Sequence, residues 1–133
     1  MRTIILAAAI SLGSMAPATA DVATVKSGVK TEITTHMRYD SRCRANPVSI
    51  KVVDVPANGT VTSEMKVIVV PAQPQRGVKQ QSPCVGKRVE GVAVFYESAP
   101  GFTGQDHFRY QRLNARDPGD KFNQEIHYIV VVE

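Results

Sequence analysis

Apolar and polar residues alternate with a period of two along most of the chain beyond residue 28. Between residues 29 and 37 the odd positions carry Val, Thr, Ile, Thr and Met, and the even positions carry Lys, Glu, Thr and His. Successive side chains of a β-strand point to opposite faces, so this alternation predicts a strand with one buried face. The same pattern recurs at residues 48–52, 65–69, 92–96, 108–110 and 126–132.

Turn-forming residues separate the predicted strands. Pro, Gly, Asn and Asp cluster between them, at residues 47, 56–59, 71–74, 100–101 and 117–119. Beyond residue 20 no stretch has a convincing helical period. About seven short strands divided by turns predict an all-β chain folded as an antiparallel β-sandwich.

The most specific motif is YESAPGFTGQDHFRY at residues 96–110. It resembles the Y-x-P-x-x-G-F-x-G-x-D-x-F-x-Y signature of bacterial Ig-like and cadherin-like repeat domains, with Ser98 where Pro is commoner. Residues 56–61 (PANGTV) resemble the turn that enters an earlier strand of that family, and residues 117–119 (DPG) resemble the turn before its last strand. The resemblance covers residues 48–132 and implies an Ig-like sandwich. The family usually occurs as tandem repeats, whereas this chain holds one copy.

The motif residues are expected to be structural: Gly101, Phe102, Gly104, Asp106, Phe108 and Tyr110. The two glycines permit a tight turn that a Cβ disfavours. Asp106 is expected to hold the loop by accepting backbone N–H bonds, rather than to act in catalysis. Phe108 and Tyr110 are predicted to point into the core. The spacing of Asp106 and Tyr110 also resembles that of a tyrosine corner.

The first twenty residues have the pattern of a secretory signal peptide. Arg2 supplies a positive start, residues 4–10 form an apolar run, and residues 18–20 (ATA) form a small-x-small cleavage site. The apolar run is much shorter than the roughly 20 residues of a membrane-spanning helix. We predict a signal peptide at residues 1–20 and a single Ig-like domain at residues 21–133, exported to the periplasm or the exterior.

Cys43 and Cys84 are the two cysteines of the chain. In an oxidising compartment two cysteines most simply form one disulfide. The alternative is a pair of free thiols for redox or metal chemistry, but they form no Cys-x-x-Cys motif and neither has a histidine at ligand spacing. The sequence therefore predicts a structural disulfide.

The chain has 16 Lys and Arg against 12 Asp and Glu, a net charge of +4, and loss of Arg2 with the signal peptide lowers it to +3. Basic residues gather near residues 38–44, 76–88 and 109–116. Six arginines form a possible surface for an anionic partner: Arg38, Arg42, Arg44, Arg109, Arg112 and Arg116. The alternative is a solvated surface with interspersed acids. The modest charge favours the second interpretation, and the export signal disfavours nucleic acid as a partner.

No sequence motif of a catalytic or cofactor site occurs, neither G-x-S-x-G, P-loop, H-E-x-x-H nor G-x-G-x-x-G. From the alternation, His36 and His107 are predicted to face solvent, and His127 lies opposite the apolar face of its strand. Together with Met37 and Met65 these are copper-ligand types. However, both methionines fall on predicted core faces, where Met usually fills space. We expect no enzyme activity, no cofactor and no metal site.

These patterns predict a non-enzymatic exported Ig-like domain with a binding or structural role at the bacterial cell envelope. Its expected partner is another protein or an envelope component, bound at an exposed edge strand or at the loops of one end. One alternative is a basic-surface module that binds an anionic envelope polymer. A less favoured one is a periplasmic metal-binding protein.

Overall fold

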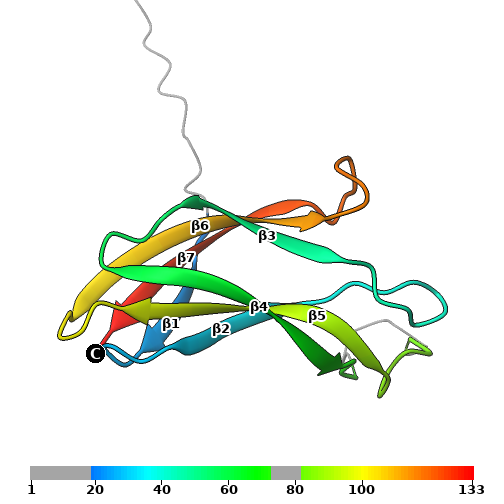
Figure 1. Ribbon diagram of the computed structural model, residues 1–133, viewed down its shortest axis with the longest axis horizontal. Coiled ribbons are helices and arrows are strands. Elements are labelled where there is room, and N and C mark those ends of the chain that lie inside the picture. Colours follow the sequence, from blue (N-terminus) through cyan, green and yellow to red (C-terminus); the bar gives the residue numbers. More distant parts are fainter. Residues whose placement is uncertain (1–18, 73–81) are drawn as a thin grey trace, which may run out of the picture.

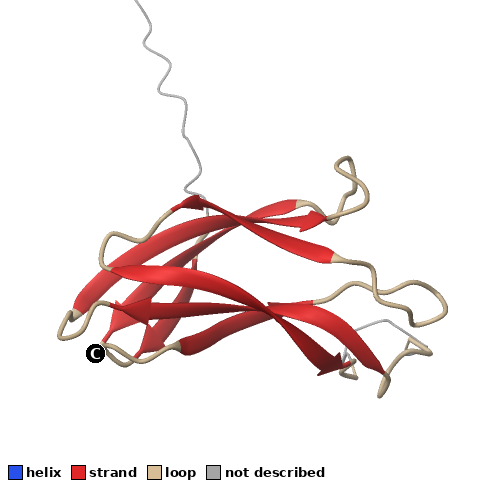
Figure 2. Cartoon of the chain, viewed as in Figure 1, coloured by secondary structure: helices blue, strands red, loops and turns tan. Residues whose placement is uncertain are grey.

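The computed structural model describes residues 19–72 and 82–133, in which seven β-strands and no helix occur (Figures 1 and 2). The strands are β1 (Asp21–Val25), β2 (Thr31–His36), β3 (Val48–Asp54), β4 (Gly59–Val69), β5 (Arg88–Ser98), β6 (Gly104–Asn114) and β7 (Gln124–Val132). The all-β class predicted from the alternation is confirmed. Within the described ranges no helix has the length and hydrophobicity of a membrane span.

The predicted signal peptide falls almost entirely outside the described residues. Its last two residues, 19 and 20, precede β1, and Asp21 is the first residue of that strand. Removal of residues 1–20 at the predicted site would therefore leave every described strand intact.

The strands form two layers, a sheet of order β1-β7-β6-β3 and a sheet of order β2-β5-β4. The orders β7-β6-β3 and β2-β5-β4 are those of strands G-F-C and B-E-D in an Ig domain. The strand pairs are antiparallel except that β1 runs parallel to β7. The predicted antiparallel β-sandwich is therefore confirmed, with one parallel pair between β1 and β7.

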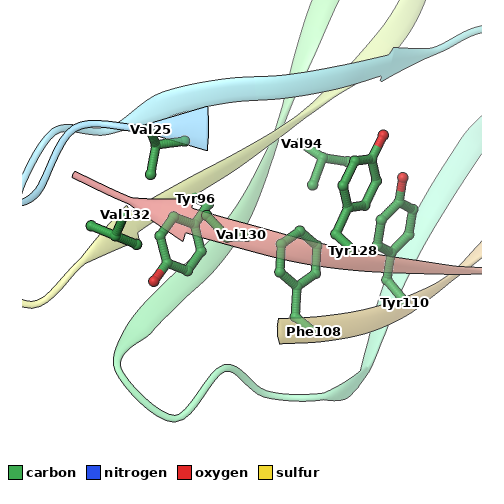
Figure 3. Packing of buried hydrophobic residues seen from close by; sticks show 8 residues of the cluster. All are labelled: Val25, Val94, Tyr96, Phe108, Tyr110, Tyr128, Val130 and Val132. Atoms are coloured by element: carbon green, nitrogen blue, oxygen red, sulfur yellow. The ribbon is translucent and has the colours of Figure 1, made fainter. Parts of the chain in front are cut away.

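The main core lies between the two sheets and is built from alternate residues of β5, β6 and β7, with Val25 of β1 (Figure 3). Four aromatic residues form its centre: Tyr96, Phe108, Tyr110 and Tyr128. Successive rings of this group have centroids 5.5 to 6.4 Å apart and lie nearly parallel. Such offset stacking adds to the free energy gained by removing the rings from water.

Asp106 joins the turn before β4 to the beginning of β6. The residue is only 3% exposed. It accepts N–H bonds from Ala57 (3.1 Å), Asn58 (3.1 Å) and His107 (2.9 Å), and the Tyr96 hydroxyl donates a fourth bond at 2.8 Å. These four donors take the place of the water molecules that would solvate an exposed carboxylate. This aspartate therefore links the beginning of β6 to the turn before β4, two segments that are far apart in the chain.

The other motif residues shape the connection from β5 to β6. Gly101 and Gly104 have φ angles of 80° and 128°, a region that residues with a Cβ rarely adopt. Phe102 packs against the main core, and Tyr110 is fully buried in it. The Tyr110 hydroxyl, however, lies 2.6 Å from Nε2 of His36. The tyrosine-corner prediction, which requires a bond to nearby backbone, is wrong.

The predicted disulfide is confirmed. Cys43 and Cys84 are bonded, with their Cα atoms 5.3 Å apart. The bridge joins the β2–β3 loop to the β4–β5 connection, and Cys84 packs with Val70 and Val89 in a smaller apolar cluster outside the main core. It therefore stabilises one end of the sandwich, in contrast to the inter-sheet bridge of antibody domains.

A β-bulge in β2 reverses the predicted alternation. The register with β5 shifts between Glu32 and Thr34, which leaves Ile33 as an extra residue. Beyond the bulge the even positions face the core. His36, predicted to face solvent, therefore lies opposite the buried Val92 and points inward.

Candidate functional site

The C-terminal half of β4 carries a row of exposed apolar side chains, Met65, Val67 and Val69, which we call the β4 stripe. Their exposed fractions are 66%, 52% and 56%. The alternation that predicted a strand here was right, but the prediction that Met65 fills the core is wrong.

The β4 stripe continues the core-facing side of the sheet beyond the core. Directly opposite residues of antiparallel strands point to the same face, and Val61 and Met65 lie opposite the buried Tyr96 and Val92. Val61 packs against the main core. Toward the end of β4 the two sheets diverge (Figure 1), and each side chain of the stripe is more than half exposed.

Among the described strands, β4 is also an edge strand of its sheet, because the order β2-β5-β4 leaves one of its sides without a partner strand. It has 11 residues, longer than most strands. Exposed edges are commonly guarded by Lys or Pro. Lys66, the one lysine of β4, instead reaches over β5 to Glu32 of β2, with Nζ 2.8 Å from Oε2. Within residues 19–72 and 82–133, nothing pairs with this edge of β4, and it is open to pairing with another strand.

A cavity of about 280 Å³ opens beside Met65, between the diverging sheets. Its other lining residues come from the β2–β3 loop, β3, β5 and the β6–β7 loop: Ala45, Pro47, Val48, Glu90, Gly91 and Arg116. The cavity could hold a side chain of an added strand, next to the β4 stripe and to the opposite charges of Glu90 and Arg116. Edge, stripe and cavity together form the candidate site.

The six arginines of the predicted anionic surface do not share one face. Arg109 lies on the outer face of its sheet and is ion-paired with Asp54 and Glu125. Arg112, three residues along β6, stacks on the Phe122 ring at 4.1 Å and borders a different cavity. The structure therefore separates two residues that the sequence grouped together.

Among the other four arginines, two are neutralised by acids. Arg38 is ion-paired with Asp120, and Arg44 binds Asp40 at 2.9 Å. Arg38 also stacks on the Phe122 ring beside Arg112. Arg42 and Arg116 are exposed. Of the remaining basic group, residues 76 and 79 lie outside the described residues.

His36 and Tyr110 form a polar pair at the margin of the core. A cavity of about 340 Å³ reaches His36 from the side of β1 and β7, and Arg112 also borders it. Burial, with a contribution from the positive charge of Arg112, lowers the pKa of His36 to about 4. Burial raises the pKa of Tyr110 above its ordinary value. At neutral pH both side chains are uncharged, and His36 is a poor general base.

We expect the free energy of unfolding to decrease as the pH falls from 7 to 4. The unfolded chain binds a proton at His36 near pH 6.5, whereas the folded protein does so only near pH 4. Because His36 is partly exposed, solvent screening limits the loss to about 1–2 kcal/mol. Urea denaturation at pH 7, 5.5 and 4.5 measures it. The His36→Gln variant should show a shallower slope, and an equal slope in both proteins would contradict the assignment.

A second polar cluster lies on the outer face of β6 and β7. It contains His107, which is exposed as predicted, and His127, with ring centroids 6.1 Å apart beside a cavity of about 410 Å³. Nε2 of His127 is buried and has no hydrogen-bond partner among the described residues. Arg109 engages both nearby carboxylates, and its hydrogen bond lowers the pKa of Asp54. In the part of the chain that is described, no three His, Cys, Asp or Glu residues are placed to hold a metal ion.

No protein-family model matches the chain, and no curated protein matches it. One solved structure that it resembles is the solution structure of amebosin, at 13% sequence identity and a TM-score of 0.42, over 84% of this chain and 88% of that chain. A similarity of this size carries no inference about fold or function. The likeness to bacterial Ig-like repeat domains rests on the sequence motif.

Proposed function

We propose that the chain is an exported, non-enzymatic Ig-like domain that binds another protein at the bacterial cell envelope through the edge strand β4. The observation that supports this most directly is the β4 stripe on a long edge with which no described strand pairs. Proteins that work alone usually protect such edges, because they invite pairing with other chains. The exposed apolar row gains free energy when a partner removes it from water.

Strand addition is the binding mode that fits this edge. A partner strand beside β4 would receive main-chain hydrogen bonds from the free side of β4. Its alternate side chains would meet the β4 stripe and the cavity beside Met65. The Cys43–Cys84 disulfide agrees with an oxidising, extracytoplasmic compartment.

The polar clusters of the described residues support a role without catalysis. His36 is uncharged at neutral pH and bonded to Tyr110. On the outer face, Asp54 and Glu125 are occupied by Arg109. The carboxylate of Asp106 accepts four hydrogen bonds from the protein itself, which hold the fold. The basic-surface alternative loses support because its arginines lie on different faces and three of them are paired with acids.

Position-specific photocrosslinking in the native host tests this proposal. A photoreactive residue at Val67 should give a reproducible covalent adduct with a protein. The matched control is Ser49, an exposed position on β3, the edge strand of the other sheet. We expect an adduct at Val67 and none at Ser49. The absence of an adduct at Val67, or the same adducts from both positions, would overturn the proposal.

A further inference from the structure

We propose that the protein covering β4 is a second copy of this chain, with the two β4 strands paired antiparallel about a two-fold axis at Met65. The inference rests on the proposed function, because it names the partner for the same edge. A two-fold interface uses one patch on both copies, so β4 must be complementary to its own reversed sequence. Its charges meet that condition.

Pairing centred on Met65 places Glu64 of each copy opposite Lys66 of the other. Directly opposite residues of antiparallel strands share a face, so two oppositely charged pairs form on the outer face of the sheet. Moving the axis by one residue places Lys66 opposite Lys66, or Glu64 opposite Glu64. Like charges directly opposite each other are unfavourable. The charge pattern of β4 therefore favours the Met65 register over its two neighbours.

The ion pairs within each copy extend this complementarity. Lys30 is paired with Glu64, and Lys66 with Glu32, both across the strand β5. In the proposed dimer, Glu64 of one copy and Lys66 of the second copy would lie side by side, between Lys30 of the first copy and Glu32 of the second. Charges would then alternate in sign across the outer face, in the order Lys30, Glu64, Lys66 and Glu32, with the last two from the second copy.

On the opposite face the two β4 stripes meet. Met65 lies opposite Met65 of the second copy, and Val67 and Val69 lie opposite Ser63 and Val61. Side chains at directly opposite positions cover one another, so each stripe loses part of its exposure. The two three-stranded sheets would become one sheet of order β2-β5-β4-β4-β5-β2, in which neither β4 edge is free.

A charge-exchange experiment tests the pairing. Sedimentation equilibrium is measured for the wild type, for Glu64→Lys, for Lys66→Glu, and for an equimolar mixture of the two variants. We expect the wild type to dimerise and each single variant to associate about tenfold more weakly, because like charges then oppose each other. The mixture should recover wild-type affinity, since a mixed dimer restores both opposite-charge pairs. A mixture that associates no better than the separate variants would overturn the proposal.

The mixture also controls for effects on folding. Each variant breaks an intrachain ion pair, but it breaks the same pair alone and in the mixture. Recovery therefore cannot come from the fold of either copy. Thermal unfolding of each variant by circular dichroism checks that both are folded.

Disulfide trapping tests the register. Oxidation of Met65→Cys should link two copies, because position 65 lies opposite itself. The control is Thr60→Cys, an exposed position on the same strand. It lies ten residues from its counterpart in this register, about 34 Å along the strands. Equal trapping of both variants, or none at position 65, would overturn the Met65 register.

Failure of this inference is distinguishable from failure of the proposed function. A protein that stays monomeric, while Val67 gives an adduct with a different protein, overturns self-pairing and leaves β4 as a binding edge for that protein. A monomer with no Val67 adduct overturns both.

Discussion

The Asp106→Ala variant is expected to lose about 3–5 kcal/mol of its free energy of unfolding. Each buried donor left without an acceptor costs about 1–3 kcal/mol, and water that enters the site offsets part of this cost by accepting some of the hydrogen bonds. The substitution removes the acceptor for three backbone N–H groups and for the Tyr96 hydroxyl. It also frees the turn at Ala57 and Asn58 from β6. Urea denaturation with circular dichroism measures the loss.

Two variants grade this effect. Asp106→Asn keeps the shape of the side chain but turns a nitrogen toward groups that are themselves donors, so an intermediate loss is expected. Tyr96→Phe removes one of the four bonds and should cost about 1 kcal/mol. An Asp106→Ala loss no larger than that of Tyr96→Phe would show that the carboxylate does not hold the turn.

Replacing both Cys43 and Cys84 by Ala is expected to lower the free energy of unfolding by about 4 kcal/mol, the chain-entropy value for this loop length. The bridge spans 41 positions, and Cys84 sits in the smaller apolar cluster. Reduction of the wild type should have a similar effect, which separates the bond from the substitutions. Oxidised and reduced protein of equal stability would contradict the expectation, and so would two free thiols in the denatured, unreduced protein.

The sequence was sufficient for the fold class because the period-two pattern and the turn residues are local. The positions of the strands and the Cys43–Cys84 pair followed from it. β1 was missed because it has only five residues and is fixed by parallel pairing with β7, a contact between opposite ends of the chain. The inward direction of His36 was missed because a bulge at Ile33 changes no residue type in the pattern.

The candidate site could not be predicted for a similar reason. Alternation shows which residues of β4 share a face, and it placed Met65 and Val67 correctly beside each other. It does not show how far the opposite sheet extends over that face. The alternation of β4 continues past the end of the core, so partly buried Val61 and exposed Val67 look alike in the sequence.

Whether β4 is a binding edge is tested most directly by comparing photocrosslinks from Val67 and Ser49 in the native host. Both positions are exposed, and both lie on edge strands, one in each sheet. Val67 belongs to the apolar row of β4, which lies beside the cavity at Met65, whereas Ser49 does not belong to that row. The proposal predicts a reproducible protein adduct from Val67, a second copy of this chain included, and none from Ser49. Adducts from Ser49 alone, or from neither position, would contradict it.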